Sequence, residues 1–151
     1  MKVLVINAGS SSLKFTVFEM NYERQLAKGV VERIGLDEPK MEYERAEDNL
    51  EQEEAVSAKY HDAALKLVCE KLVDTQAGVL NDLSEVEAVG HRVVHGGEKF
   101  SESVLVTSEV KQAIDECAQL APLHNPPNLG GIKACENVFP GTPNVAVFDT
   151  A

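Results

Sequence analysis

A short loop near the N-terminus has the composition of a phosphate-binding turn. The segment Asn7-Ala8-Gly9-Ser10-Ser11-Ser12 lies between two strand-like stretches. Backbone N–H groups and serine hydroxyls in such a turn can surround phosphate oxygens, and Lys14 follows two residues into the next strand. Asn7 offers a neutral oxygen suited to a magnesium ion or its water. A hairpin turn that merely favours glycine and serine is the alternative, since the loop has neither P-loop spacing nor a G-x-G-x-x-G pattern.

A second candidate is the segment Gly90-His91-Arg92-Val93-Val94-His95-Gly96-Gly97. An arginine among apolar residues at a strand end is unfavourable unless an anion pairs with it. The planar guanidinium of Arg92 matches a carboxylate or a phosphate through two parallel hydrogen bonds. An internal ion pair with one of the chain's many acids is the alternative. His91 and His95 are expected to make structural hydrogen bonds rather than to act in catalysis.

Two further residues could take part in the chemistry. His124 lies in the segment Leu123-His124-Asn125-Pro126-Pro127, where the prolines restrict the backbone and could hold the imidazole in one orientation. The alternative is an ordinary exposed loop histidine. Asp149 directly follows the apolar residues 145–148, so it is either a capping acid or a carboxylate that acts in catalysis or positions a metal. The residues alone favour capping.

The elements that position these residues follow from apolar periodicity. Residues 3–6 form an uninterrupted apolar run, which is typical of a strand buried on both faces. Alternation over residues 13–17 predicts a second strand, and residues 27–34 predict a third. Three successive strands with a tight first turn indicate an antiparallel meander.

Helices and two more strands follow along the chain. We predict a helix over about 57–74 and a strand over 86–94. A second helix is predicted to contain Val110 and Cys117, with Ser108 as its N-cap. A third helix is predicted to begin at the prolines and stop before Pro140-Gly141, and a last buried strand is predicted over 145–148. The order βββ, α, β, α, α, β predicts a mixed α/β fold.

Charge and composition argue against several functions. The 151 residues carry a net charge of −11, which makes nucleic acid an unexpected partner. A membrane role is not expected, because no apolar run approaches the roughly 18 residues of a membrane span and the N-terminus does not fit a signal peptide. The three widely spaced cysteines predict reduced core residues of a cytoplasmic protein and do not fit zinc.

Two features bear on the organisation of the chain. Residues 37–54 hold nine acidic and two basic side chains with no clean period, which predicts a solvated excursion between core elements. The sequence also stops just after the last predicted strand. Because an α/β sheet builds its binding crevice at that edge, we expect the chain to be one part of a longer protein.

Taken together, four segments resemble the signatures of bacterial acetate kinases. They are Asn-Ala-Gly-Ser-Ser-Ser-Leu-Lys at 7–14, Gly-His-Arg-Val-Val-His-Gly-Gly at 90–97, Leu-Ala-Pro-Leu-His-Asn-Pro-Pro-Asn-Leu at 120–129 and Val-Phe-Asp-Thr-Ala at 147–151. The resemblance spans essentially the whole chain but only the N-terminal part of the family's enzymes. It implies a ribonuclease-H-like βββαβα lobe of the actin-like ATPase class, with a mixed sheet and flanking helices. Residues 1–151 would form this lobe, and a second, nucleotide-binding lobe would be absent.

The resemblance also implies roles for individual residues. The positions that match the family's functional residues are Asn7 for magnesium; Gly9, Ser10, Ser11, Ser12 and Lys14 for ATP; Arg92 for the acetate carboxylate; Val94 and Leu123 for its methyl group; His124 for the transferring phosphoryl group; and Asp149 as the active-site aspartate. The family's second histidine, second arginine, metal-binding glutamate and adenosine pocket would all fall beyond Ala151.

The implied reaction is the reversible transfer of the ATP γ-phosphoryl group to acetate, with Mg²⁺, in a cytoplasmic enzyme that is a homodimer at full length. The isolated lobe is expected to be inactive. A propionate or butyrate kinase with a roomier acyl pocket is one alternative, although the branched side chain of Val94 favours acetate. A non-catalytic, actin- or Hsp70-like nucleotide-binding lobe is the other.

Overall fold

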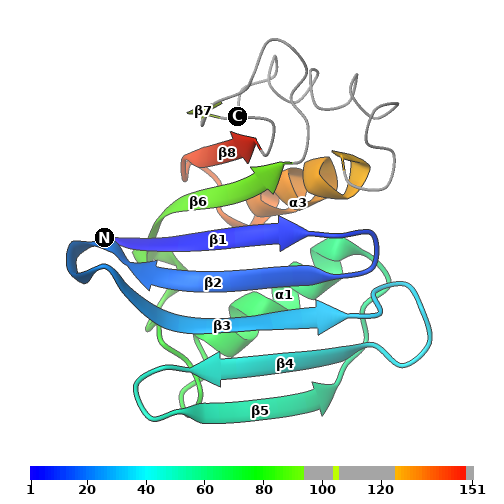
Figure 1. Ribbon diagram of the computed structural model, residues 1–151, viewed down its shortest axis with the longest axis horizontal. Helices are drawn as coiled ribbons and strands as arrows, with labels where there is room; N and C mark the ends of the chain where they lie inside the picture. The colour runs from blue at the N-terminus through cyan, green and yellow to red at the C-terminus, as the bar shows by residue number, and fades with distance from the viewer. Residues whose placement is uncertain (94–103, 106–124, 149–151) are drawn as a thin grey trace.

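The fold is built on one mixed β-sheet, described here from a computed structural model over residues 1–93, 104–105 and 125–148. Within these residues the strands are β1 (Lys2–Ala8), β2 (Leu13–Glu19), β3 (Arg24–Glu32), β4 (Lys40–Arg45), β5 (Leu50–Ala55), β6 (Val86–Val93), β7 (Val104–Leu105) and β8 (Asn144–Phe148). They are ordered β5-β4-β3-β2-β1-β6-β8-β7 across the sheet (Figure 1). The pairs β1–β6 and β6–β8 are parallel, and the other pairs are antiparallel.

The predicted N-terminal meander is confirmed. Strand β1 pairs antiparallel with β2, and β2 pairs antiparallel with β3. The register opposes Ala8 to Leu13, so the Gly/Ser loop is a tight connection of residues 9–12, here called the 9–12 loop. The third strand begins at Arg24 and ends at Glu32, two to three residues earlier than the pattern indicated at each end.

The prediction of a solvated excursion over residues 37–54 is wrong. Strands β4 and β5 form an antiparallel hairpin that extends the sheet. Met41 and Tyr43 are buried at 2% and 1% exposure, and the Tyr43 hydroxyl donates to the Ala77 carbonyl at 2.7 Å. The two buried side chains alternate with Lys40, Glu42 and Glu44, so the strand has a period of two. With only two apolar residues, that period was hidden by the acidic ones.

A glycine makes room for the hairpin's largest side chain. Gly29 of β3 lies between Phe15 of β2 and Tyr43 of β4 in the register, and those two rings stack with centroids 6.3 Å apart. A Cβ at Gly29 would lie 2.6 Å from Phe15 Cζ and only 2.2 Å from the Glu42 carbonyl oxygen. The close approach of these groups therefore requires glycine at this position.

Helices α1 (His61–Leu72) and α3 (Asn125–Val138) cover one face of the sheet, behind it in Figure 1. The core between them contains Leu4, Ile6, Leu65 and Ile132, all at 1% exposure or less. A Cβ at Gly131 of α3 would lie 3.2 Å from the Ala8 Cβ, so this helix passes very close to the end of β1. The helix predicted at the prolines is confirmed, and the one predicted over 57–74 begins later, at His61.

The cysteines of the described residues agree with the expectation of reduced core residues. Cys69 and Cys135 are both free thiols and both buried. Burial raises the pKa of each thiol to about 12, which keeps them protonated and unreactive. Cys117 and the helix predicted around it lie outside the described residues.

The opposite face of the sheet, here called the open face, is not packed against either described helix. It presents the alternate residues of the central strands, whose neighbours point into the core. Those residues are Val3, Val5 and Asn7 of β1, Lys14 and Thr16 of β2, and Ala88, Gly90 and Arg92 of β6. Within the described ranges, no helix combines the length and apolar character needed to cross a bilayer.

Candidate active site at the carboxyl ends of the parallel strands

Three of the predicted site residues lie together on the open face. Asn7 and Lys14 are direct cross-strand partners in the β1–β2 register, where facing side chains are roughly 5 Å apart at Cβ. Ile6 pairs with His91 in the parallel β1–β6 register, so Asn7 and Arg92 occupy the next positions of the two strands. Open α/β sheets bind ligands at this edge, outside the carboxyl ends of their parallel strands. The strands thus gather an amide, an ammonium and a guanidinium beside the 9–12 loop.

The carbonyls of Gly9, Ser11 and Ser12 in the 9–12 loop accept hydrogen bonds, whereas most of the loop's donors are not used. The Ser12 carbonyl accepts from the Gly9 N–H at 2.9 Å, and the Ser11 carbonyl accepts from the Ile34 N–H at 2.8 Å. Over the described residues, no acceptor takes the N–H groups or the hydroxyls of Ser10, Ser11 and Ser12. A run of unpaired N–H groups in a turn binds anions. The loop therefore has the hydrogen-bonding polarity of a phosphate site, beyond its composition.

His61 also contacts this loop and was not anticipated from the sequence. Its Nε2 lies 2.7 Å from the Gly9 carbonyl oxygen and 3.2 Å from that of Ser12. His61 is the first residue of α1, whose N-cap residue Tyr60 makes no side-chain capping bond. A histidine in the first turn of a helix was the only signal in the sequence. The partner lies 52 residues away, so no local pattern could have identified it.

Lys14 and Arg92 are both exposed, which corrects part of the sequence argument. Lys14 makes no ion pair in the part of the chain that the structure describes. The neighbours of Arg92, His91 and Val93, point into the core, whereas Arg92 itself points to the open face. The unfavourable burial that would have demanded an anion is therefore absent. The position of Arg92 beside Asn7 and Lys14 remains the argument for an anion role.

His91 is a structural residue, as predicted. Its exposure is 2%, and its Nε2 lies 2.8 Å from the Asn144 Oδ1, while the Asn144 side-chain amide donates to the Thr142 carbonyl at 3.1 Å. Burial lowers the pKa of the His91 imidazole, and the hydrogen bond with Asn144 opposes that effect. The neutral ring therefore ties β6 to the start of β8.

His91 should make the stability of the chain depend on pH. In the unfolded chain the His91 imidazole takes up a proton near pH 6.5, whereas in the folded chain it takes one up only at a lower pH. The free energy of unfolding should therefore be largest above about pH 6.5 and should decrease as the pH falls below that value. The slope should reach at most about 1.4 kcal/mol per pH unit. Urea unfolding of the wild type and His91→Gln between pH 7.5 and 5.5 measures it. We expect a shallower pH dependence in His91→Gln, and equal slopes would contradict this assignment.

Several predicted site residues lie outside the described residues. They are Val94, Leu123, His124 and Asp149; His95, which was expected to make a structural hydrogen bond, lies outside them too. The described residues also contain no group of three or more His, Cys, Asp or Glu side chains that could hold a metal. Asn7 is the one predicted metal ligand among them, and its amide oxygen suits a hard cation.

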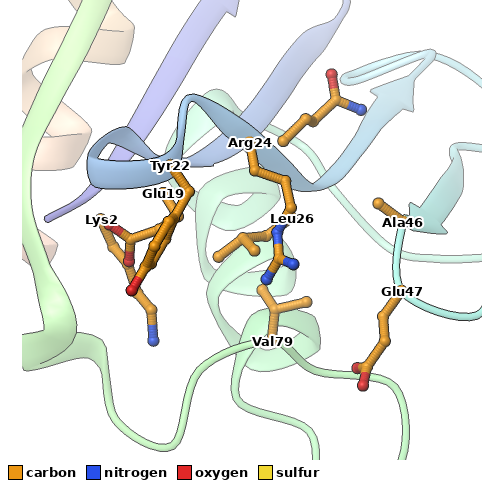
Figure 2. A pocket seen from close by; sticks show the side chains of 9 residues that line it. Lys2, Glu19, Tyr22, Arg24, Leu26, Ala46, Glu47 and Val79 are labelled. Atoms are coloured by element: carbon orange, nitrogen blue, oxygen red, sulfur yellow. The ribbon is translucent and has the colours of Figure 1, made fainter.

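A separate hollow lies at the other end of the strands and has no features of this site. It measures about 590 Å³ and is lined by residues that include Lys2, Glu19, Tyr22 and Arg24 (Figure 2). Lys2 pairs with Glu85 at 2.6 Å, and Glu19 pairs with the N-terminal ammonium at 2.6 Å. The charges here are of both signs, and Lys2 and Glu19 are paired, so we assign this hollow no function.

These features define a mixed α/β lobe that presents a glycine- and serine-rich loop with unpaired N–H groups at the carboxyl end of β1. Over residues 2–151 the chain matches the acetokinase family, and it belongs to that family. The fold class predicted from the sequence is confirmed: the chain is similar over its length to solved acetate kinases.

Individual relatives make the relationship specific. The chain is 53% identical over 153 residues to the acetate kinase of Desulfitobacterium hafniense strain DSM 10664 / DCB-2, and 54% identical over 151 residues to that of Thermotoga maritima. The crystal structure of Porphyromonas gingivalis acetate kinase matches 99% of the chain at a TM-score of 0.95 and 43% identity. A propionate kinase from Francisella tularensis matches 99% at 0.88 and 35% identity.

The chain spans only part of each relative. It is covered completely by the two acetate kinases but accounts for 38% and 37% of their lengths. It likewise covers 37% of each of the two crystal structures.

Proposed function

We propose that this chain is the N-terminal lobe of an acetate kinase, an enzyme that transfers the ATP γ-phosphoryl group to acetate. Its close similarity to acetate kinases supports the reaction. The observation that carries the proposal is the 9–12 loop, whose unpaired N–H groups adjoin Lys14 and lie at the same sheet edge as Arg92. Residues 1–151 would be one lobe, and the adenosine pocket would be supplied by a second lobe.

The 9–12 loop, Lys14 and Arg92 would reduce the electrostatic repulsion between the two substrates, which is the main physical obstacle to the reaction. Acetate and ATP are both anions, so positive groups must offset their repulsion and hold the attacking and leaving oxygens in line. The 9–12 loop and Lys14 would bind ATP phosphates, and Arg92 would hold the acetate carboxylate through two hydrogen bonds. Both cations are exposed on the open face.

No general base is required in this reaction. Acetate is already ionised at neutral pH, because carboxyl groups titrate near pKa 4. We therefore assign Asp149 to positioning magnesium or water, and His124 to contact with the transferring phosphoryl group. Val94 and Leu123 would line the pocket of the acetate methyl group. These four roles rest on the resemblance to the family.

Asn7 fits a magnesium site as one ligand among several. Its amide oxygen is hard and neutral, and its side chain is half-buried next to Lys14 rather than enclosed by carboxylates. The described residues supply no carboxylate cluster, so Asn7 would hold the ion directly or through water while Asp149 and groups of the second lobe complete the site. When bound, magnesium would neutralise charge on the ATP phosphates.

A propionate kinase is the second candidate, because the Francisella tularensis propionate kinase has a similar structure. Val94 would favour acetate, since a branched side chain in the acyl pocket would narrow it. One methylene in an apolar pocket changes kcat/KM by roughly 10- to 200-fold. Comparison of acetate and propionate as substrates of the full-length enzyme decides between them. We further propose that the full-length enzyme is cytoplasmic and forms a homodimer. Light scattering of the purified enzyme would test the dimer.

The 151-residue chain is expected to be inactive by itself, whereas a full-length protein with this N-terminal part should make acetyl phosphate. Phosphates bound to the lobe alone would stay in water, where electrostatic stabilisation is weak. Acetyl phosphate can be trapped with hydroxylamine and measured for both proteins. Turnover by the 151-residue chain at even one per cent of the full-length rate would show that the catalytic groups assigned to the second lobe are not required. No acetyl phosphate from the full-length protein would refute the proposed reaction.

A further inference from the structure

The 9–12 loop rests on a side chain from α1. His61 Nε2 lies within hydrogen-bond distance of two loop carbonyls, those of Gly9 at 2.7 Å and Ser12 at 3.2 Å. Both acceptors are carbonyl oxygens, so this nitrogen must carry the hydrogen and donate it to them. The His61 side chain is half-buried between the helix and the loop.

This contact sets the direction of the loop's peptide groups. A peptide plane carries its C=O and N–H on opposite sides, so a carbonyl turned toward α1 turns the following N–H away from it. The Gly9 carbonyl belongs to the same peptide as the Ser10 N–H, one of the donors that has no acceptor in the described part of the chain. Holding the Gly9 carbonyl therefore holds the Ser10 N–H outward.

The other bonds of the loop do not replace this one. The Gly9 N–H donates to the Ser12 carbonyl, and the Ile34 N–H donates to the Ser11 carbonyl. Within the described residues the Gly9 carbonyl has His61 as its only hydrogen-bond donor. Without that donor, a half-buried carbonyl either stays unpaired or rotates, and leaving it unpaired is unfavourable.

We propose that His61 is a positioning residue for phosphate binding: it fixes the 9–12 loop with its carbonyls toward α1 and its N–H groups toward the ligand. The proposal rests on the proposed function, because it takes the loop to be a phosphate site. His61 itself does not touch the phosphate. It acts by removing the alternative in which the loop carbonyls face an anion and repel it.

The test is a titration of the 151-residue chain with inorganic pyrophosphate, followed by the NMR shifts of the Ser10, Ser11 and Ser12 amides. His61→Ala removes the donor, and His61→Gln keeps an N–H at a similar distance from the backbone. Tyr60→Ala is the matched control, since Tyr60 is the adjacent residue, is 71% exposed and makes no capping bond. Circular dichroism sets a temperature at which all four proteins are folded.

We expect His61→Ala to weaken pyrophosphate binding by about tenfold, the effect of one lost hydrogen bond of about 1.4 kcal/mol. His61→Gln should recover most of the affinity, and Tyr60→Ala should match the wild type. If His61→Ala lowers the melting temperature but binds pyrophosphate within about twofold of the wild type, His61 is only structural and the inference fails. If the wild type does not bind at these amides, the phosphate role of the loop fails instead, which separates the two proposals.

Discussion

Replacing Arg92 by alanine in a full-length acetate kinase with this N-terminal lobe is expected to lower kcat/KM for acetate by about 100- to 1000-fold. That is the range for removing one preorganised group that stabilises charge in the transition state. Arg92 lies on the open face next to the strand position of Asn7, so the loss should appear with acetate as the varied substrate. Steady-state kinetics with a hydroxylamine trap measure it.

Two further variants interpret that result. Arg92→Lys keeps the charge but not the two parallel hydrogen bonds, so it should recover only part of the activity. Arg24→Ala removes another exposed arginine of the same sheet, at the end away from the 9–12 loop, and should leave the kinetics unchanged. A loss of less than about threefold in Arg92→Ala, well below 1 kcal/mol, would remove Arg92 from the acetate site.

Gly29→Ala is expected to cause the largest loss of stability among the substitutions considered. Its Cβ would lie 2.2 Å from the Glu42 carbonyl and 2.6 Å from Phe15 Cζ, so β3 and β4 must separate or the aromatic ring must move. Overpacking of this kind destabilises by about 3 kcal/mol at the upper end of its usual range. In a chain of this size the melting temperature should fall by about 6–12 °C. Thermal unfolding followed by circular dichroism measures the change.

Gly130→Ala is the control for that substitution. A Cβ at Gly130 of α3 meets no atom within 4 Å, and alanine is the better helix former. Its free energy of unfolding should therefore stay the same or rise by up to about 1 kcal/mol. If both variants lost a similar free energy of unfolding, the close packing around Gly29 that the register of β2, β3 and β4 implies would be wrong.

The parts of the fold that were predicted correctly depend on local pattern. The meander of β1, β2 and β3 follows from an apolar run, a turn rich in glycine and serine, and a period of two, all within about 30 residues of sequence. The start of α3 follows from the prolines, which fit the first turn of a helix. The structural role of His91 follows from its place inside an apolar strand.

The parts that were missed depend on side-chain direction or on distant contacts. Strand β4 was not recognised in the sequence because Met41 and Tyr43 are its only apolar residues. Tyr43 stabilises the strand through contacts with Phe15 and Ala77, which are distant in the sequence. Arg92 was placed in apolar surroundings because its neighbours in sequence are apolar, although alternation turns them to the other face. The role of His61 required the helix and the loop to be placed together in space.

The acidic hairpin also has a consequence for how copies of this chain meet. Strand β5 is an edge of the sheet, and its exposed side chains include Glu51, Glu53 and Glu54. A second β5 laid against it would bring carboxylates of both copies together, and charged side chains on an edge are a common protection against sheet extension between molecules. The charge that hides this strand in the sequence therefore disfavours pairing of two copies of the sheet at β5.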